Sequence, residues 1–290
     1  MFRKILIANR GEIAVRIIRA ARELGIDTVA VYSTADKEAL HTLLADEAVC
    51  IGPAKSTDSY LNMNAVLSAA VLTGAEAIHP GFGFLSENSK FATMCEEVGI
   101  KFIGPSGAVM DLMGDKINAR AQMIKAKVPV IPGSDGEVHT SEEALEVAEK
   151  IGYPVMLKAS AGGGGKGIRK VEKPEDLVAA FESASSEAKA AFGNGAMYME
   201  RVIYPARHIE VQILADQQGH VVHLGERDCS LQRNNQKVLE ESPSVAIGKT
   251  LRQQIGEAAV RAAQSVGYEN AGTIEFLLDE AKGEFYFMEM

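Results

Sequence analysis

Short apolar segments alternate with amphipathic ones over the first 110 residues, and this rhythm constrains the fold more than any other feature of the sequence. Residues 4–9 are apolar, and after Gly11 the apolar positions recur at helical spacing as far as Gly25. The same alternation continues with strands expected at 28–32, 48–51, 77–79 and 101–103, and helices expected at 62–73 and 88–98. Strands that alternate with helices predict a doubly wound parallel sheet.

The rest of the chain predicts a small mixed α/β region followed by an antiparallel sheet. Its expected helices cover 115–126, 140–150 and 251–266, and its expected strands cover 154–159, 168–171, 208–215, 221–224, 273–278 and 284–290. Thr140 and Glu143 have the spacing of a capping box, which starts the second of these helices. The connector 128–134 marks a domain boundary, and the last two strands flank a turn and form a hairpin.

Composition excludes several classes of protein. The formal net charge of −9 argues against broad binding to a nucleic-acid backbone, so an anionic ligand needs a local basic site. The three cysteines are far apart and lack metal-ligand spacing, which favours a reduced cytoplasmic setting over a disulfide framework. The first apolar run is too short for a signal peptide, and no later run approaches the ~20 residues of a membrane span.

A run of four glycines at 162–165, followed by Lys166 and Gly167, lies between two predicted strands. It is not a P-loop, which needs Ser or Thr after the lysine, and the turn at Gly11 lacks the three glycines of a dinucleotide fingerprint. What remains is a hairpin whose backbone N–H groups can close over phosphates, with Lys166 and Arg169 adding charge. A plain linker explains the run equally well.

Two glutamates in the final hairpin suggest a metal site. If Asp279 pairs with Phe285, Glu275 lies directly opposite Glu289, and like charges placed in this way are destabilising. A shared divalent cation would relieve the repulsion, and carboxylate oxygens suit magnesium carrying phosphates. The alternative, in which each glutamate is solvated on an outer sheet face, stays open.

Other polar positions are candidates for nucleotide contacts. Lys116 begins a predicted helix and Lys158 ends a strand just before the glycine run, where a lysine reaches a phosphate or simply stays in water. Residues 200–203 lead into Tyr204-Pro205, which is either an adenine-binding hinge or an ordinary linker. The polar segment 226–237 has no hydrophobic periodicity and is expected to be a functional loop.

Four strings together resemble bacterial biotin carboxylase. They are Ile-Ala-Asn-Arg-Gly-Glu-Ile-Ala at 7–14, His-Pro-Gly-Phe-Gly-Phe-Leu-Ser-Glu-Asn at 79–88, Lys-Ala-Ser-Ala-Gly-Gly-Gly-Gly-Lys-Gly at 158–167, and Glu-Arg-Asp-Cys-Ser at 226–230. The resemblance spans the whole chain and implies the ATP-grasp fold. It divides the chain into an N-terminal domain at 1–114, a connecting helix and linker at 115–130, a lid domain at 131–203 that carries the glycine loop, and the first part of a C-terminal domain at 204–290.

The resemblance also assigns roles to residues. The implied ATP contacts are Lys116, Lys158, Gly164, Gly165, Glu200, Arg201, Val202, Ile203, His208 and Gln232; the implied magnesium ligands, with manganese as an alternative metal, are Glu275 and Glu289; and Lys237 is the implied bicarbonate-binding residue. Asn235 departs from the pattern of relatives that carry histidine there, which puts a histidine role at that position in doubt.

The implied reaction is ATP-dependent carboxylation of biotin. Bicarbonate attacks the γ-phosphate of ATP to give carboxyphosphate, and the carboxyl group passes to biotin on a carrier protein, the first half-reaction of acetyl-CoA carboxylase. The implied partners are the biotin carboxyl carrier protein and carboxyltransferase subunits, and the full-length family forms homodimers. The family continues past the position of Met290 with a metal ligand, an arginine and a glutamate base, so residues 1–290 are not expected to complete the reaction alone. Pyruvate carboxylase and other ATP-grasp ligases are the alternatives.

Overall fold

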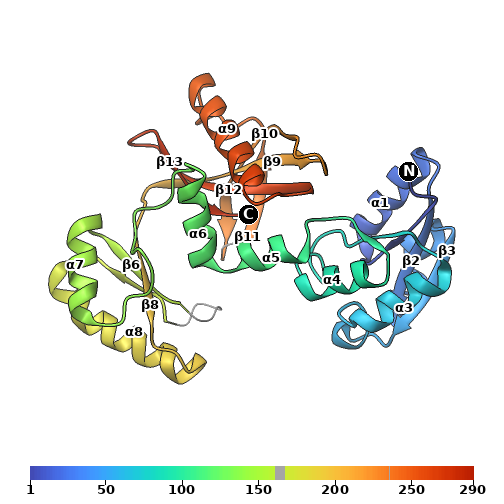
Figure 1. The fold of residues 1–290 in the computed structure, drawn as a ribbon, viewed down its shortest axis with the longest axis horizontal. Coiled ribbons are helices and arrows are strands. Elements are labelled where there is room, and N and C mark those ends of the chain that lie inside the picture. Colours follow the sequence, from blue (N-terminus) through green and yellow to red (C-terminus); the bar gives the residue numbers. More distant parts are fainter. Residues whose placement is uncertain (161–166, 235) are drawn as a thin grey trace. The chain divides into compact units, whose positions relative to one another are not determined.

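Residues 1–160, 167–234 and 236–290 are described by the computed structural model, and the chain divides into two compact units. Unit 1 comprises Met1–Lys116 together with Leu214–Val222 and Ala263–Gly272. Unit 2 comprises Ile117–Ile213, His223–Ala262 and Thr273–Met290. Figure 1 labels most of the helices and strands of the two units. Among the described residues, no helix combines the length and the apolar character that crossing a membrane requires.

Unit 1 is built on a parallel five-stranded sheet, as the alternation predicts. Its strand order is β3 (Glu47–Gly52), β2 (Asp27–Ser33), β1 (Lys4–Ile7), β4 (Ala77–His79) and β5 (Lys101–Phe102), and each neighbouring pair is parallel. The helices are α1 (Gly11–Glu23), α2 (Leu40–Leu44), α3 (Met63–Thr73), α4 (Ser89–Glu97) and α5 (Gly107–Gly114). The chain reverses its direction of winding between β1 and β4, which is where such sheets form ligand crevices.

Helices cover both faces of this sheet. Leu6 in β1 packs into a cluster with Val66 of α3 and Phe91 of α4. Its neighbour Ile7 points to the opposite face and packs with Ile18 of α1. Because both faces are buried, the central strands are apolar at successive positions, which explains why their sequence has no polar alternation.

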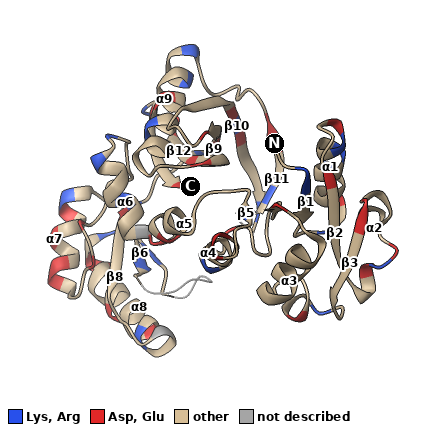
Figure 2. Ribbon diagram, turned by 45° about the vertical axis from the view of Figure 1, so that its right-hand side comes forward, with Lys and Arg blue, Asp and Glu red and all other residues tan. Residues whose placement is uncertain are grey.

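Unit 2 contains a three-stranded antiparallel sheet, within the range predicted to be the lid, in the order β7 (Arg169–Val171), β6 (Val155–Ala159), β8 (Met197–Arg201). Helices α7 (Ser141–Ile151) and α8 (Leu177–Phe192) pack against it, and α6 (Lys116–Lys125) precedes it in the chain. The Thr140 hydroxyl accepts a bond from the Glu143 amide, as predicted, while the Glu143 carboxylate accepts from the His139 amide. Acidic side chains gather on the solvent side of α7 (Figure 2).

The second sheet of unit 2 has five strands in the order β11 (Gln236–Glu241), β10 (Val221–Arg233), β9 (Ala206–Ala215), β12 (Asn270–Asp279), β13 (Glu284–Glu289). Helix α9 (Lys249–Ser265) accompanies these strands, and the final hairpin is antiparallel, as expected.

The prediction of a loop at 226–237 was wrong, because β10 continues to Arg233 and β11 starts at Gln236. Glu226 and Asp228 are buried in β10, yet both are satisfied. Glu226 bonds Arg252, and Asp228 bonds Ser244. Polar side chains with partners elsewhere in the chain occupy inward positions of this strand, so it lacks the apolar periodicity that marks an ordinary one.

Candidate active site

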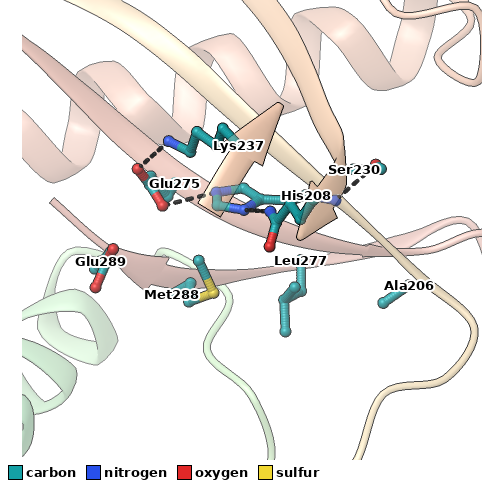
Figure 3. A pocket seen from close by; sticks show the side chains of 9 residues that line it. Ala206, His208, Ser230, Lys237, Glu275, Leu277, Met288 and Glu289 are labelled. Carbon is teal, nitrogen blue, oxygen red and sulfur yellow. Dashed lines mark hydrogen bonds and ion pairs between the residues drawn. The ribbon is translucent and has the colours of Figure 1, made fainter. Parts of the chain in front are cut away.

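A cavity of about 500 Å³ opens on the five-stranded sheet of unit 2. Figure 3 shows that its wall is formed by side chains from all five strands. The lining residues are Ala206, His208, Ser230, Gln232, Lys237, Glu275, Leu277, Met288 and Glu289. Five of these residues, drawn from separate parts of the sequence, are candidates from the sequence analysis: His208, Gln232, Lys237, Glu275 and Glu289.

The two glutamates face each other, although the reasoning that predicted this had the wrong register. Asp279 pairs with Glu284, one residue earlier than the expected Phe285. A β-bulge between Glu275 and Phe276 then shifts the pairing by one residue and sets Glu275 opposite Glu289. Without that shift Glu289 would pair with Ile274, which is fully buried in the core, instead of lining the cavity.

Both oxygens of Glu275 lie close to a nitrogen atom. Lys237 Nζ lies 2.7 Å from Oε1, and His208 Nε2 lies 2.7 Å from Oε2. Burial raises the pKa of Glu275, but hydrogen bonds from His208 and Lys237 outweigh that effect and lower the pKa to about 2. Glu275 is therefore an anion at neutral pH and offers two negatively charged oxygens at the wall of the cavity.

Gln232 fixes the tautomer of His208. Its amide nitrogen lies 2.9 Å from the Cys229 carbonyl oxygen and 2.7 Å from His208 Nδ1. Because the carbonyl can only accept, that amide atom is the NH2 group, and its other hydrogen points to Nδ1. In the neutral ring the proton is then on Nε2, the atom that lies 2.7 Å from Glu275 Oε2. Two residues that sequence reasoning treated as separate nucleotide contacts act on one carboxylate.

Lys237 is held by a second carboxylate, which sequence reasoning missed. Its Nζ atom lies 2.5 Å from Glu210 Oε2, and Arg227 binds the other oxygen of the same carboxylate. Burial lowers the pKa of Lys237, but the hydrogen bonds that it donates to Glu210 and Glu275 raise this pKa above its ordinary value, so the ammonium stays charged. Glu210 follows His208 by two residues in β9. That period-2 spacing was the available signal, because it places both side chains on one face of the strand.

Ser230 and Asp228 support the backbone of His208. The His208 amide donates to the Ser230 hydroxyl at 3.0 Å, and this hydroxyl donates to Asp228 Oδ1 at 2.5 Å. Asp228 also accepts from Ser244 and forms an ion pair with Arg207. Burial raises the pKa of Asp228, but hydrogen bonds from Ser230 and Ser244 lower it below its usual value. The carboxylate therefore anchors the strand that carries His208.

The lid candidates lie on β6 and β8 and in the connection that follows. Lys158 and Glu200 form an ion pair across these strands, so two predicted nucleotide contacts bind each other here. Arg201 donates to the Tyr286 hydroxyl at 3.0 Å, and the Val202 amide donates to the Pro154 carbonyl at 2.8 Å. Ile203 is half-buried in the connection to β9.

Some candidates lie outside the described residues. They are Gly164, Gly165 and Lys166 of the glycine run, Asn235, and the side chain of Lys116, whose backbone begins α6.

The cavity has the donors and acceptors for a divalent cation beside an anion. Glu275 and Glu289 supply hard oxygen ligands of the kind that magnesium prefers. Lys237 supplies a positive charge at the same wall. A divalent cation held by the two glutamates would add positive charge beside Lys237, which would favour an anionic substrate in the cavity.

Comparison with known proteins agrees with this chemistry. Residues 115–290 match the family described as carbamoyl-phosphate synthase L chain, ATP binding domain, and residues 1–110 match the biotin carboxylase N-terminal domain. A biotin carboxylase from Nostoc sp. is 60% identical over 289 residues, which is 100% of this chain and 64% of that protein. This chain therefore spans about two thirds of the length of that curated relative.

Two solved structures are similar over the whole chain. A biotin carboxylase from Campylobacter jejuni, solved as a βγ-ATP complex, has a TM-score of 0.90 at 53% identity and is matched over 65% of its length. The biotin carboxylase domain dimer of the 2-oxoglutarate carboxylase from Hydrogenobacter thermophilus, solved with MgADP, ADP and bicarbonate, has a TM-score of 0.87 at 53% identity and is matched over 64%.

The fold and the cavity therefore define an ATP-binding protein of the ATP-grasp class. Its doubly wound N-terminal sheet lies in the residues that match the biotin carboxylase N-terminal domain. The chain belongs to the biotin carboxylase family, with the ATP-binding domain shared with the carbamoyl-phosphate synthase L chain.

Proposed function

We propose that this chain is the nucleotide- and bicarbonate-binding part of a biotin carboxylase, which uses ATP to carboxylate biotin on a carrier protein. The observation that carries the proposal is the cavity in which Lys237 lies at one wall with Glu275 and Glu289. The solved relative that contains MgADP and bicarbonate supports this choice of ligands. The same relative is a 2-oxoglutarate carboxylase, so similarity to this family does not by itself select acetyl-CoA as the final acceptor.

We assign the residues of the site to ligands according to their charge. Glu275 and Glu289 would hold magnesium, or manganese in its place, and the bound metal would supply positive charge next to the phosphates. Lys237 binds bicarbonate, and His208 with Gln232 orients Glu275. Lys116, Lys158 and the amides of Gly164 and Gly165 contact the phosphates, while Glu200, Arg201, Val202 and Ile203 surround the adenine.

The division into domains follows from these roles. We assign residues 1–114 to the N-terminal domain, 115–130 to the connection, 131–203 to the lid and 204–290 to the first part of the C-terminal domain. A lid that closes over the nucleotide excludes water, which protects a labile carboxyphosphate from hydrolysis. The partners proposed for the full-length protein are the biotin carboxyl carrier protein, carboxyltransferase subunits and a second copy of the same polypeptide.

Biotin-dependent turnover tests the proposal. The protein at its full natural length should release phosphate from ATP faster when biotin and bicarbonate are both present. Lys237→Met should reduce that turnover by at least about 100-fold, because a group that holds a reactant acts together with the rest of the site. Lys170→Met is the matched control, since Lys170 forms an exposed pair with Glu172 on the lid. Equal turnover of the two variants would contradict the assignment.

A second candidate function is that of another ATP-grasp ligase, favoured by the match of residues 115–290 to the carbamoyl-phosphate synthase ATP-binding domain. Such an enzyme shares the acyl-phosphate strategy but has no need of biotin. ATP hydrolysis that responds to bicarbonate and ignores biotin would support this alternative.

A further inference from the structure

Lys237 occupies the place where a cation would meet Glu275. Its ammonium lies 2.7 Å from Glu275 Oε1 and 2.5 Å from Glu210 Oε2, so one positive charge is shared by two carboxylates (Figure 3 shows the Glu275 contact). The other oxygen of Glu275 faces His208 Nε2 at 2.7 Å. Each oxygen of this proposed metal ligand therefore has a nitrogen atom of another side chain beside it, and the ammonium of Lys237 donates to one of them.

Metal coordination and this ion pair compete for the same oxygen. Magnesium binds carboxylate oxygens at about 2.0–2.1 Å and tolerates little distortion of its coordination shell. An ammonium at hydrogen-bond distance from Oε1 would place a like charge beside the bound ion. Charge repulsion between the bound metal and the ammonium therefore favours departure of Lys237 from Oε1 when the metal binds there.

Glu210 has the properties needed to hold Lys237 when the ammonium leaves Glu275. Its side chain is only 5% exposed, and it does not line the cavity. Arg227 binds the other oxygen of Glu210 and also donates to Gln212 at 3.2 Å. These two bonds hold the Glu210 carboxylate in place independently of Lys237. An ammonium has three donors, and one bond to Glu210 leaves two that can turn to the cavity.

We propose that Glu210 is a positioning residue that keeps Lys237 at the cavity wall while a divalent cation displaces it from Glu275, so that cation binding frees Lys237 for the anionic substrate. This inference rests on the proposed function, because it takes Glu275 as a metal ligand and bicarbonate as the anion. Cation and anion binding are then coupled, and linkage makes the coupling reciprocal.

A structure of the full-length protein with manganese and ADP tests the displacement without any variant. The expected result has manganese on Glu275, Lys237 Nζ beyond 4 Å from Oε1, and the contact between Lys237 and Glu210 retained. A structure in which manganese binds Glu275 while Lys237 stays within hydrogen-bond distance of Oε1 would overturn the inference. So would a lysine that leaves Glu210 and keeps Glu275.

Binding measurements test the coupling. Bicarbonate affinity is measured from the line width of 13C-bicarbonate, with a diamagnetic magnesium salt of ADP present or absent. We expect magnesium-ADP to tighten bicarbonate binding about 10-fold in the unmodified protein, within the usual range of coupling between sites. In Glu210→Gln the effect should fall below about 2-fold. Glu47→Gln is the matched control, because Glu47 forms an equivalent lysine pair with Lys4 in unit 1 and should retain the full effect.

The outcomes separate the inference from the function on which it rests. Failure of the unmodified protein to bind magnesium-ADP would overturn both. Binding of magnesium-ADP with no change in bicarbonate affinity would overturn only the coupling. A coupling that survives in Glu210→Gln would show that the metal acts on bicarbonate through its charge alone, and would remove Glu210 from the account.

Discussion

Asn9 holds the loop that follows β4 in unit 1, and changing it to aspartate should release that loop. Its amide nitrogen donates to the Pro80 and Phe82 carbonyl oxygens, each at 2.7 Å, from a side chain that is almost fully buried. Asn9→Asp preserves the shape but replaces the two N–H donors by a carboxylate oxygen that faces two carbonyl oxygens.

The size of the effect follows from the environment of each carbonyl. The bond to Pro80 is buried, so its loss leaves an acceptor that water does not reach, at a cost of about 2 kcal/mol. The bond to Phe82 is partly buried, and water replaces much of it, for about 1 kcal/mol. Together these losses destabilise the closed loop by about 3 kcal/mol, which corresponds to a roughly 100-fold increase in the population of the open loop.

Hydrogen exchange measured by mass spectrometry reports this opening directly. The amide of Gly81 donates to His79 Nδ1 and that of Ser86 to the Gly83 carbonyl, so both become exposed when the loop opens. Asn64→Asp is the control, because it makes the same chemical change at an exposed position of α3. Exchange at Gly81 and Ser86 within threefold of the control would refute the role given to Asn9.

Two further predictions concern carboxylates. Glu289→Gln should weaken binding of magnesium-ATP at least about 10-fold while leaving the hairpin folded, which calorimetry and circular dichroism check together; unchanged affinity would remove Glu289 from the metal site. Burial raises the pKa of Asp36, but hydrogen bonds from Tyr60, Ser33 and Arg10 lower it overall, so its contribution to stability is present above pH ~4 and is lost as the pH falls through the folded-state pKa. Asp36→Asn should therefore lower the free energy of unfolding in urea at pH 7 and have a smaller effect at pH 3; an equal effect at both values would contradict this.

The fold of unit 1 was predictable because its information is local. Apolar strands buried on both faces and helices that repeat every three to four residues can be read within short windows. Strand β4 was predicted with its exact bounds, Ala77–His79. Helix α7 was predictable for the same reason, since Thr140 and Glu143 are three residues apart.

The features that the sequence did not reveal depend on ion pairs between residues that are distant in the sequence. The partner of Glu226 is Arg252, and that of Glu210 is Lys237, 27 residues away. No pattern within β10 shows that its carboxylates are neutralised, so the strand resembles a polar loop. Glu210 was overlooked for the same reason, because a buried carboxylate shows its role only when the lysine that it holds is in place.

The hairpin shows how a correct contact can follow from an incorrect register. The alternation of Phe285, Phe287 and Glu289 fixes which residues share a face but does not reveal where a strand takes up an extra residue. The four-residue turn at 280–283 aligns Asp279 with Glu284, and the bulge beside Glu275 then restores the alignment of the two glutamates. The prediction depended on the repulsion between the two facing glutamates. That repulsion is the same wherever along the hairpin the register shift occurs. Lys237 supplies the compensating charge in this structure, and a divalent cation is the stronger competitor for the same oxygens because it carries twice the charge and coordinates at a shorter distance.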